Sequence, residues 1–265
     1  QDNWPQWRGP TANGVSTSTG LPVEWSLEKN IVWQTELPSW SGATPIIWGD
    51  RIFLTAASAF GEATKKEHEH SDGDHDNMAP EFHQRSVILA VNRVDGSILW
   101  EKTVNKERPH ESAHVTGSWA SNSPVTDGEY VIASFGSRGI YCLDIDGELA
   151  WKKDLGDMKV KHGHGEGSSP ALHGDTVVIN WDHEGDSFAV ALDKNTGEEI
   201  WRTARDEVSS WSTPLIIEHA GRPQAIITAT TRVRSYDLSN GKVLWECGGL
   251  SNNVVASPVA AAGFL

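Results

Sequence analysis

The segment SPALHGDTVVINWDHEGDSFAVALDKNTGEEIW, residues 169–201, contains the pattern that determines the fold. It holds four short runs with alternating apolar residues, SPALHG, TVVINW, SFAVALD and, extending to residue 204, EEIWRTA. The runs are separated by HGD, DHEGD and KNTG, which supply the glycine, aspartate and asparagine that tight turns need for positive φ. The segment therefore predicts four short antiparallel strands.

The same pattern recurs along the chain. Each unit begins with a Ser-Pro or Thr-Pro step, and successive prolines are separated by 79, 46, 44 and 44 residues: Pro45, Pro124, Pro170, Pro214 and Pro258. Each complete unit ends in a tryptophan that follows a glycine by four residues: Gly96 and Trp100, Gly147 and Trp151, Gly197 and Trp201, Gly241 and Trp245. Four strands repeated in this way are typical of a β-propeller blade, and not of a sandwich or a helical solenoid.

Two features of the repeat resemble a known family. Ala191, Asp193, Thr196, Gly197 and Trp201 resemble the tryptophan-docking motif of the PQQ-like, quinoprotein-type propeller repeat. The segments WPQWRGP at 4–10 and FGSRGIYCLDIDG at 135–147 resemble secreted PQQ-like repeat proteins of the planctomycete type. The second unit lacks one residue between Asp144 and Gly147, which predicts a tighter turn there. The resemblance implies a ring of about eight blades, within the range known for propellers.

The tryptophans that end the units are interpreted as structural. A flat indole at the end of an outer strand can bury most of its area against the next blade while its N–H bonds to a backbone carbonyl. The alternative, that Trp100, Trp151, Trp201 and Trp245 stack on a substrate, is not favoured.

The units define an all-β, incomplete ring with about four full blades, at 43–104, 121–155, 167–205 and 211–249. Trp33, in NIVWQTEL, is expected to lie in the outer strand of a partial blade, and the tail from Val255 supplies one inner strand. We expect a single propeller domain over residues 1–265 that is truncated at its C-terminus, a fragment of a longer protein. A loop insertion rich in His and Asp occupies 58–86.

Composition excludes several classes of protein. The net charge of −14 argues against binding to nucleic acid or to anionic lipid, because both require a basic surface. No apolar run approaches the roughly 20 residues of a membrane span.

The two cysteines form neither a disulfide framework nor a zinc pattern, and Cys142 is expected to be a small buried hydrophobe not paired with Cys247. The start at Gln1 favours a processed periplasmic or secreted protein.

Nearly all unusual polar residues fall in the loops that join the second strand to the third and one blade to the next. These loops share one face of a propeller, so we expect the ligand site there. The predicted site residues are Trp40, His114, Trp119, Arg138, His164, Glu166, Asn180, Asp182, His183, Glu184, Trp211 and Arg232, with His110, Asn122, His162 and Asp186 as further members. The alternative is that long loops are polar because they are solvated.

The insertion permits two interpretations. Asp72, Asp74 and Asp76 begin like an EF-hand loop, but Asn77 replaces the sixth-position glycine and His83 replaces the final glutamate, so the match fails. The histidines could bind a transition metal: His68, His70, His75 and His83. A solvated loop is the favoured interpretation, because the stretch is too polar to fold by itself.

Two functions are compatible with these residues. The favoured one is a non-catalytic, extracytoplasmic binding or scaffolding module whose partner is an envelope protein, a glycan or a small polar ligand.

The resemblance also implies an alternative, a dehydrogenase of alcohols or sugars that uses pyrroloquinoline quinone (PQQ) and calcium. The adjacent cysteines of such enzymes are absent here. Glu166, Asn180 and Asp182 are the nearest calcium-ligand types, and Asp186 the nearest base. Motifs of nucleophilic hydrolases, dinucleotide sites and P-loops are also absent.

Overall fold

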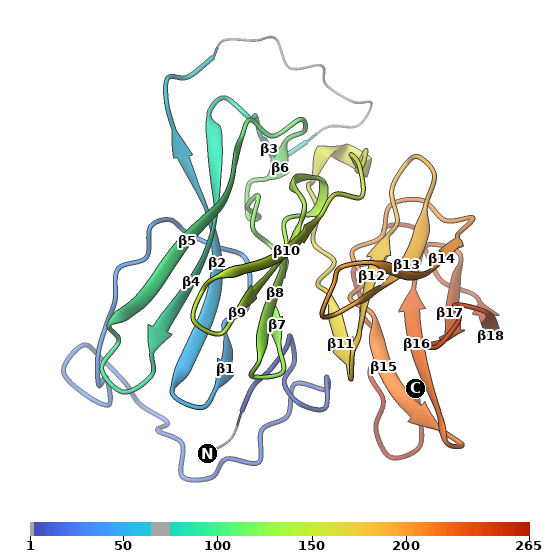
Figure 1. The fold of residues 1–265 in the computed structure, drawn as a ribbon, viewed down its shortest axis with the longest axis horizontal. Coiled ribbons are helices and arrows are strands. Elements are labelled where there is room, and N and C mark those ends of the chain that lie inside the picture. Colours follow the sequence, from blue (N-terminus) through green and yellow to red (C-terminus); the bar gives the residue numbers. More distant parts are fainter. Residues whose placement is uncertain (1–2, 65–74) are drawn as a thin grey trace.

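The computed structural model describes residues 3–64 and 75–265. Four antiparallel sheets of four strands follow one another along the chain, and a separate two-stranded sheet joins β3 to β6. The four sheets are arranged as blades in an arc that does not close into a barrel (Figure 1). The predicted class, an incomplete propeller of four-stranded blades, is confirmed.

Each blade runs from an inner strand to an outer strand in the order of the chain, apart from β3 and β6, which lie in connections. The first blade contains β1 (Ile46–Trp48), β2 (Arg51–Phe60), β4 (His83–Asn92) and β5 (Ile98–Glu107). The second contains β7 (Val125–Thr126), β8 (Tyr130–Ser134), β9 (Ile140–Asp144) and β10 (Leu149–Lys153). The third contains β11 (Ala171–His173), β12 (Thr176–Trp181), β13 (Phe188–Asp193) and β14 (Glu199–Ala204). The fourth contains β15 (Leu215–His219), β16 (Arg222–Thr228), β17 (Arg232–Asp237) and β18 (Val243–Gly248).

The hydrophobic core lies between the blades. The inner strands β1, β7, β11 and β15 contact one another in that order. One apolar cluster lies between the first and second blades, a second between the second and third, and a third between the third and fourth. Because both faces of an internal blade are covered, its middle strands are buried almost throughout, as in β13. In the described part of the chain, no helix has the length and apolar character needed to cross a bilayer.

Tryptophans join each blade to the next at the outer strands. Their indole N–H groups donate to carbonyl oxygens of the following blade: Trp100 to Ile145 at 3.1 Å, Trp151 to Lys194 at 2.6 Å and Trp201 to Leu238 at 2.7 Å. Each indole also covers a glycine of that blade. A Cβ on Gly197, for example, would lie 2.7 Å from Trp151. The repeat glycine is therefore the seat for the tryptophan of the preceding blade, in addition to allowing a positive φ.

The segment around Trp33 makes the same contacts with the first blade. Its indole N–H donates to the Arg93 carbonyl at 2.9 Å, and a Cβ on Gly96 would lie 2.5 Å from the ring. Trp33 thus occupies the place that the sequence predicts for an outer-strand residue, although residues 31–37 form no regular strand. Trp245, the equivalent residue of the fourth blade, is 37% exposed.

A ladder of hydrogen bonds joins the inner strands, and we call it the hydroxyl ladder. The residue before each repeat proline donates its backbone N–H to the hydroxyl of the equivalent residue in the next unit. The bonds run from Thr44 to Ser123 at 2.9 Å, from Ser123 to Ser169 at 2.9 Å, from Ser169 to Thr213 at 3.1 Å and from Thr213 to Ser257 at 2.8 Å. The Ser-Pro or Thr-Pro step is therefore an inter-blade contact as well as a repeat marker.

The connection between β2 and β4 covers residues 61–82, so both strands extend into the ends of the predicted 58–86 insertion. Within it, β3 (Asn77–Met78) pairs with β6 (Ala113–His114), a contact that the sequence did not predict. His68, His70, Asp72 and Asp74 lie outside the described residues. Both cysteines are free, and Cys142 is buried, as predicted.

Candidate functional site

The antiparallel strand order places two sets of loops on one face of the molecule. These are the connections between the second and third strands of a blade and those between consecutive blades, at the top of Figure 1. A cavity of about 620 Å³ opens among the inner-strand ends, and we call it the central cavity. Its lining comes from every blade and from the N-terminal segment: Trp7, Gly42, His75, His114, Thr116, Gly117, Ser121, Ser123, His162, His164, Gly167, Ser169, Trp211, Thr213, Asn253, Val255 and Ser257.

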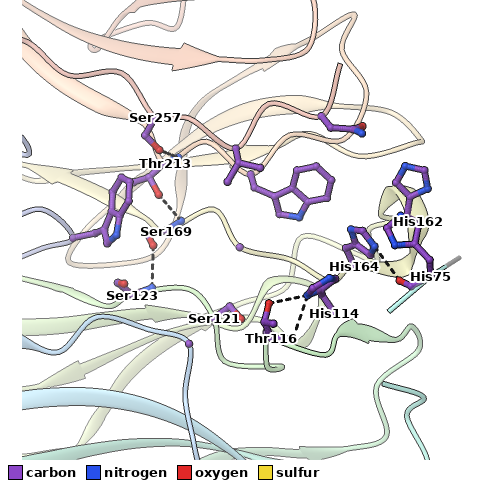
Figure 2. A pocket seen from close by; sticks show the side chains of 17 residues that line it. His75, His114, Thr116, Ser121, Ser123, His162, His164, Ser169, Thr213 and Ser257 are labelled. Atoms are coloured by element: carbon purple, nitrogen blue, oxygen red, sulfur yellow. Dashed lines mark hydrogen bonds between the residues drawn. The ribbon is translucent and has the colours of Figure 1, made fainter. Parts of the chain in front are cut away.

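Four imidazoles gather at one end of the central cavity, and we call them the His cluster: His75, His114, His162 and His164 (Figure 2). The ring centroids of His164 and its neighbours lie 4.7 Å apart for His75, 4.8 Å for His114 and 5.4 Å for His162. The hydroxyl ladder lies toward the other end of the cavity in the same view.

Backbone contacts between three separate segments hold the His cluster together. Asn77 of β3 pairs with His114 of β6, and its side-chain amide donates to the His162 carbonyl at 2.6 Å. The backbone N–H of His114 donates to the His164 carbonyl at 3.1 Å, and the His164 ring donates from Nε2 to the His75 carbonyl at 3.2 Å. His162 has a φ of 59°, a conformation uncommon outside glycine, and the chain therefore turns at His162, just before His164.

The wall of the central cavity carries few titratable groups, although the Asp76 carboxylate lies 3.3 Å from His75 behind it. Among the described residues that line the central cavity, none is Asp, Glu, Lys or Arg, so the four histidines are its titratable side chains. Burial, followed by the nearby imidazoles, lowers the pKa of His164 below its usual value. Over residues 3–64 and 75–265, no group of three or more His, Cys, Asp or Glu side chains has an arrangement that could hold a metal ion.

The rest of the cavity wall is made of hydroxyl groups and two indoles. The four ladder hydroxyls accept backbone N–H groups, and none of them donates to another described residue, so each retains its own proton as a donor. Trp211 is fixed by a bond of 2.8 Å from its indole N–H to the Gly165 carbonyl. Trp7 comes from the WPQWRGP segment, in which Pro5 accepts the Thr126 backbone N–H at 2.9 Å.

A second polar group on the same face is closed to solvent, and we call it the ion-pair cluster: Asp182, Arg205, Ser210 and Tyr236. The Arg205 guanidinium donates to both Asp182 carboxylate oxygens, at 2.6 and 3.0 Å, and both side chains are 0% exposed. Ser210 donates to Asp182 at 2.7 Å, and Arg205 also donates to the Tyr236 hydroxyl. The cluster therefore satisfies its own charges and hydrogen bonds.

Glu166 and Asn180 lie close to the ion-pair cluster. Both oxygens of the Glu166 carboxylate turn inward and accept from Ser137, with a bond of 2.7 Å from its backbone N–H and another from its hydroxyl. Burial raises the pKa of Glu166 to about 7. The Asn180 amide donates to Ser210 at 3.1 Å, while its Oδ1 is buried without a hydrogen-bond partner among the described residues.

These residues do not form a calcium site. Calcium takes 6–8 oxygen ligands, but the Asp182 oxygens are bound to the Arg205 cation and those of Glu166 to Ser137. The cavity that Glu166, Asn180 and Asp182 share has a volume of about 10 Å³, room for one water molecule. A water that donates to Asn180 Oδ1 accounts for that atom better than a metal does.

Nor do the cysteines fit a quinone site. Burial raises the pKa of Cys142 to about 12, so its thiol is inert inside β9. Cys247 is exposed at the end of β18, and neither cysteine is among the residues that line the central cavity. A pair of adjacent cysteines over a bound quinone is therefore not formed by the described residues.

Of the twelve predicted site residues, His114, His164 and Trp211 line the central cavity. Six others lie outside the cavity: Trp40 is exposed, and five make separate contacts. Trp40 is 52% exposed, Trp119 donates to the Glu111 carbonyl, Arg138 pairs with Glu107 and Asp157, His183 accepts the Lys159 N–H, Glu184 accepts the Ser209 N–H, and Arg232 pairs with Asp206.

Sequence analysis missed the part that two residues play in the central cavity. His75 was considered only within the insertion, and Trp7 only as part of a resemblance. The unusual tryptophan content of WPQWRGP was the one signal for Trp7.

The four-stranded blades and their repeated sequence pattern define the class of the protein: it is a β-propeller built from PQQ-like repeats. Residues 84–260 match the family described as outer membrane protein assembly factor BamB, and the chain belongs to this family. No curated protein matches the sequence.

Solved structures of quinohemoprotein alcohol dehydrogenases share the fold at low identity. Quinohemoprotein alcohol dehydrogenase from Comamonas testosteroni is 12% identical, with a TM-score of 0.61 over 95% of this chain and 42% of its own. A quinohemoprotein alcohol dehydrogenase from Pseudomonas putida HK5 is 13% identical, with a TM-score of 0.54 over 84% and 36%. BamB from Moraxella catarrhalis is 16% identical, with a TM-score of 0.48 over 82% and 67%. The chain thus spans about two fifths of the length of these dehydrogenases.

Proposed function

We propose that this chain is an extracytoplasmic, periplasmic or secreted, β-propeller module that binds a ligand at its polar loop face without redox chemistry. The ligand is an envelope protein, a glycan or a small polar molecule. Membership of a family described by an outer-membrane assembly factor supports a binding role. Long polar loops on a rigid scaffold are the usual location of such sites.

The observation that carries this proposal is the central cavity. Its volume of about 620 Å³ lies within the range of roughly 300–1,000 Å³ that is usual for small-molecule sites. It combines two indoles with hydroxyl and imidazole groups, the mixture of apolar surface and few directional polar groups that ligand sites present. The tryptophans of the blade junctions, by contrast, are occupied by structural contacts.

The dehydrogenase alternative has support from the fold but not from the site. The structural similarity to quinohemoprotein alcohol dehydrogenases is a similarity of architecture at 12–13% identity, and architecture alone does not transfer an activity. The acidic residues that calcium would need are engaged by Arg205 and Ser137. We therefore favour binding over catalysis.

A ligand panel tests the proposal. Thermal-shift and calorimetric measurements on the purified protein with small glycans, peptides and polar metabolites are expected to find a ligand whose affinity falls at least about tenfold in Trp211→Ala. Trp25→Ala is the matched control, because that indole is 68% exposed, does not line the cavity and is not among the predicted site residues. In parallel, the protein is incubated with PQQ, calcium and an alcohol together with an artificial electron acceptor. Alcohol-dependent reduction of the acceptor would overturn the proposal.

A further inference from the structure

We propose that the central cavity binds a carboxylated sugar, with the carboxylate at the His cluster and the sugar ring between the cluster and the hydroxyl ladder. This inference rests on the proposed binding function and specifies its ligand class. It assigns roles to His75 and Trp7 in addition to the predicted residues His162, His164 and Trp211.

The charge around the cavity differs from that of the whole protein. The chain carries a net charge of −14, yet no described residue that lines the central cavity is acidic. A carboxylate in the cavity meets imidazoles, hydroxyls and indoles along the lining. Two charged groups lie just behind this lining: the Asp76 carboxylate, 3.3 Å from His75, and the Arg8 guanidinium, 4.2 Å from the ring centre of Trp7. The lining, which holds imidazoles and no acidic side chain among the described residues, therefore suits an anion better than the average surface of this acidic protein.

The wall of the cavity offers several hydrogen-bond donors. The backbone N–H of Thr116 donates to His114 Nδ1 at 3.2 Å, which places the His114 ring proton on Nε2. The ladder hydroxyls are used as acceptors by backbone N–H groups, so Ser169 and Thr213, for example, offer their protons to a ligand. A row of donors opposite a group of imidazoles fits the oxygen-rich edge of a sugar acid.

The indoles and the size of the cavity favour a sugar over a simple inorganic anion. Trp7 and Trp211 both line the cavity, and an indole offers an apolar surface on which the C–H face of a sugar ring can lie. The volume of about 620 Å³ far exceeds the space that a sulfate or phosphate ion needs. Figure 2 places the His cluster toward one end of the cavity and the ladder toward the other, so the sugar ring is assigned to the space between them.

Binding of this kind depends on pH. Among the described residues, charged groups on the segments that carry the His cluster or pack beside them include Asp76, whose carboxylate lies 3.3 Å from His75, Lys161, which precedes His162, and Glu111, whose carboxylate accepts the Val160 N–H. Crowding and burial keep His164 neutral in the free protein at pH values where an ordinary histidine is half charged. A bound carboxylate favours the charged imidazole, so binding takes up a proton and the affinity rises as the pH falls.

The experiment is calorimetric titration of the protein with D-glucuronate, in buffer with EDTA, at pH 5.5 and pH 8. D-glucose is the neutral probe of matched size, and sodium sulfate is the anion without a sugar ring. Glucuronate is expected to bind at pH 5.5 and to bind about tenfold more weakly at pH 8. Glucose and sulfate are expected to bind at least about tenfold more weakly than glucuronate at pH 5.5.

His164→Gln is expected to weaken glucuronate binding at pH 5.5 by about tenfold and to reduce its dependence on pH. His219→Gln, which changes an exposed histidine at the β15–β16 turn on the opposite face, is the matched control. His75→Gln, at a side chain that is 58% exposed, provides a second variant should His164→Gln not fold. A circular dichroism spectrum checks each variant.

The inference is overturned if glucuronate gives no heat at pH 5.5, if glucose or sulfate binds equally well, or if the His164 and His219 variants behave alike. In that case, continued Trp211-dependent binding of another ligand would leave the proposed function standing. Alcohol oxidation with PQQ and calcium would instead remove the proposed function itself.

Discussion

Two polar groups on the same face of the propeller have opposite characters. The ion-pair cluster of Asp182, Arg205, Ser210 and Tyr236 is fully enclosed, and its members satisfy one another. The His cluster opens onto a cavity of about 620 Å³, and the ladder hydroxyls of that cavity retain protons for a ligand. Both come from loops that look alike in sequence. Burial and hydrogen-bond satisfaction therefore distinguish the two groups here, and residue type does not.

Energetics explain why the two groups behave differently. A buried charge is tolerated only when it is paired and hydrogen-bonded, so every polar atom of an enclosed cluster becomes committed to the fold. Polar groups at the wall of an open cavity keep water as an alternative partner and can exchange it for a ligand. Substitutions should thus affect stability at the first group and binding at the second.

The largest effect is expected for Arg205→Met. Removal of the guanidinium leaves the enclosed Asp182 carboxylate without its countercharge, which should lower the free energy of unfolding by about 3–5 kcal/mol. Urea denaturation measures the change. Arg232→Met is the matched control, because Arg232 pairs with Asp206 at the surface and should cost about 0–1 kcal/mol. Equal effects of the two substitutions would contradict the distinction between closed and open polar groups.

The next effect concerns the packing beside Glu166. Gly136 has a φ of 54°, and a Cβ there would lie 1.3 Å from Glu166 Oε2. Gly174, with a φ of 56° and no atom within 4 Å of such a Cβ, is the matched control. Both alanine variants carry the left-handed backbone cost of roughly 1–2 kcal/mol. Only Gly136→Ala adds overpacking, expected to cost about 1–3 kcal/mol more in thermal or urea unfolding. Indistinguishable variants would mean that Glu166 moves away without cost.

A third effect appears in the dependence of stability on pH. Burial raises the pKa of Glu166 to about 7, above its usual 4.5, so between these values the folded protein binds more protons than the unfolded chain. The free energy of unfolding should therefore fall as the pH rises from 4.5 to 7, by at most about 1.4 kcal/mol per pH unit from this group. Glu166→Gln removes that contribution. Urea titrations at several pH values would contradict it if wild type and variant kept the same slope.

The sequence predicted the architecture more fully than the site. The spacing of the prolines and of the Gly–Trp pairs was sufficient for the blades, because each repeat is a local pattern of strands and turns. The contacts these residues make are between blades, so the seat that Gly197 forms for Trp151 and the ladder from Ser123 to Ser169 emerged only in the structure.

The site depends on still more distant contacts. The loops that share one face followed from strand order, but sequence order does not say which polar side chains satisfy one another. Asp182 and Arg205 looked like two more residues of a polar face until their pairing was seen. His75 reaches His164 across 89 positions of the chain through the pairing of β3 with β6. Two-residue strands of this kind leave no periodic signal.

The smallest effect on stability is expected at the His cluster. At pH 8, His164→Gln should change the free energy of unfolding by no more than about 0.5 kcal/mol, because the side chain is half-buried beside an open cavity. The lowered pKa of His164 means that the folded protein binds fewer protons than the unfolded chain near the usual histidine value. The contribution of His164 to the free energy of unfolding is therefore present above pH 6.5 and is lost as the pH falls. The contribution of Glu166 has the opposite dependence and is lost as the pH rises. The variant should be relatively more stable at pH 5 than at pH 8 when compared with wild type in urea titrations. A large loss of stability at both pH values would show that the His cluster, like the ion-pair cluster, serves the fold.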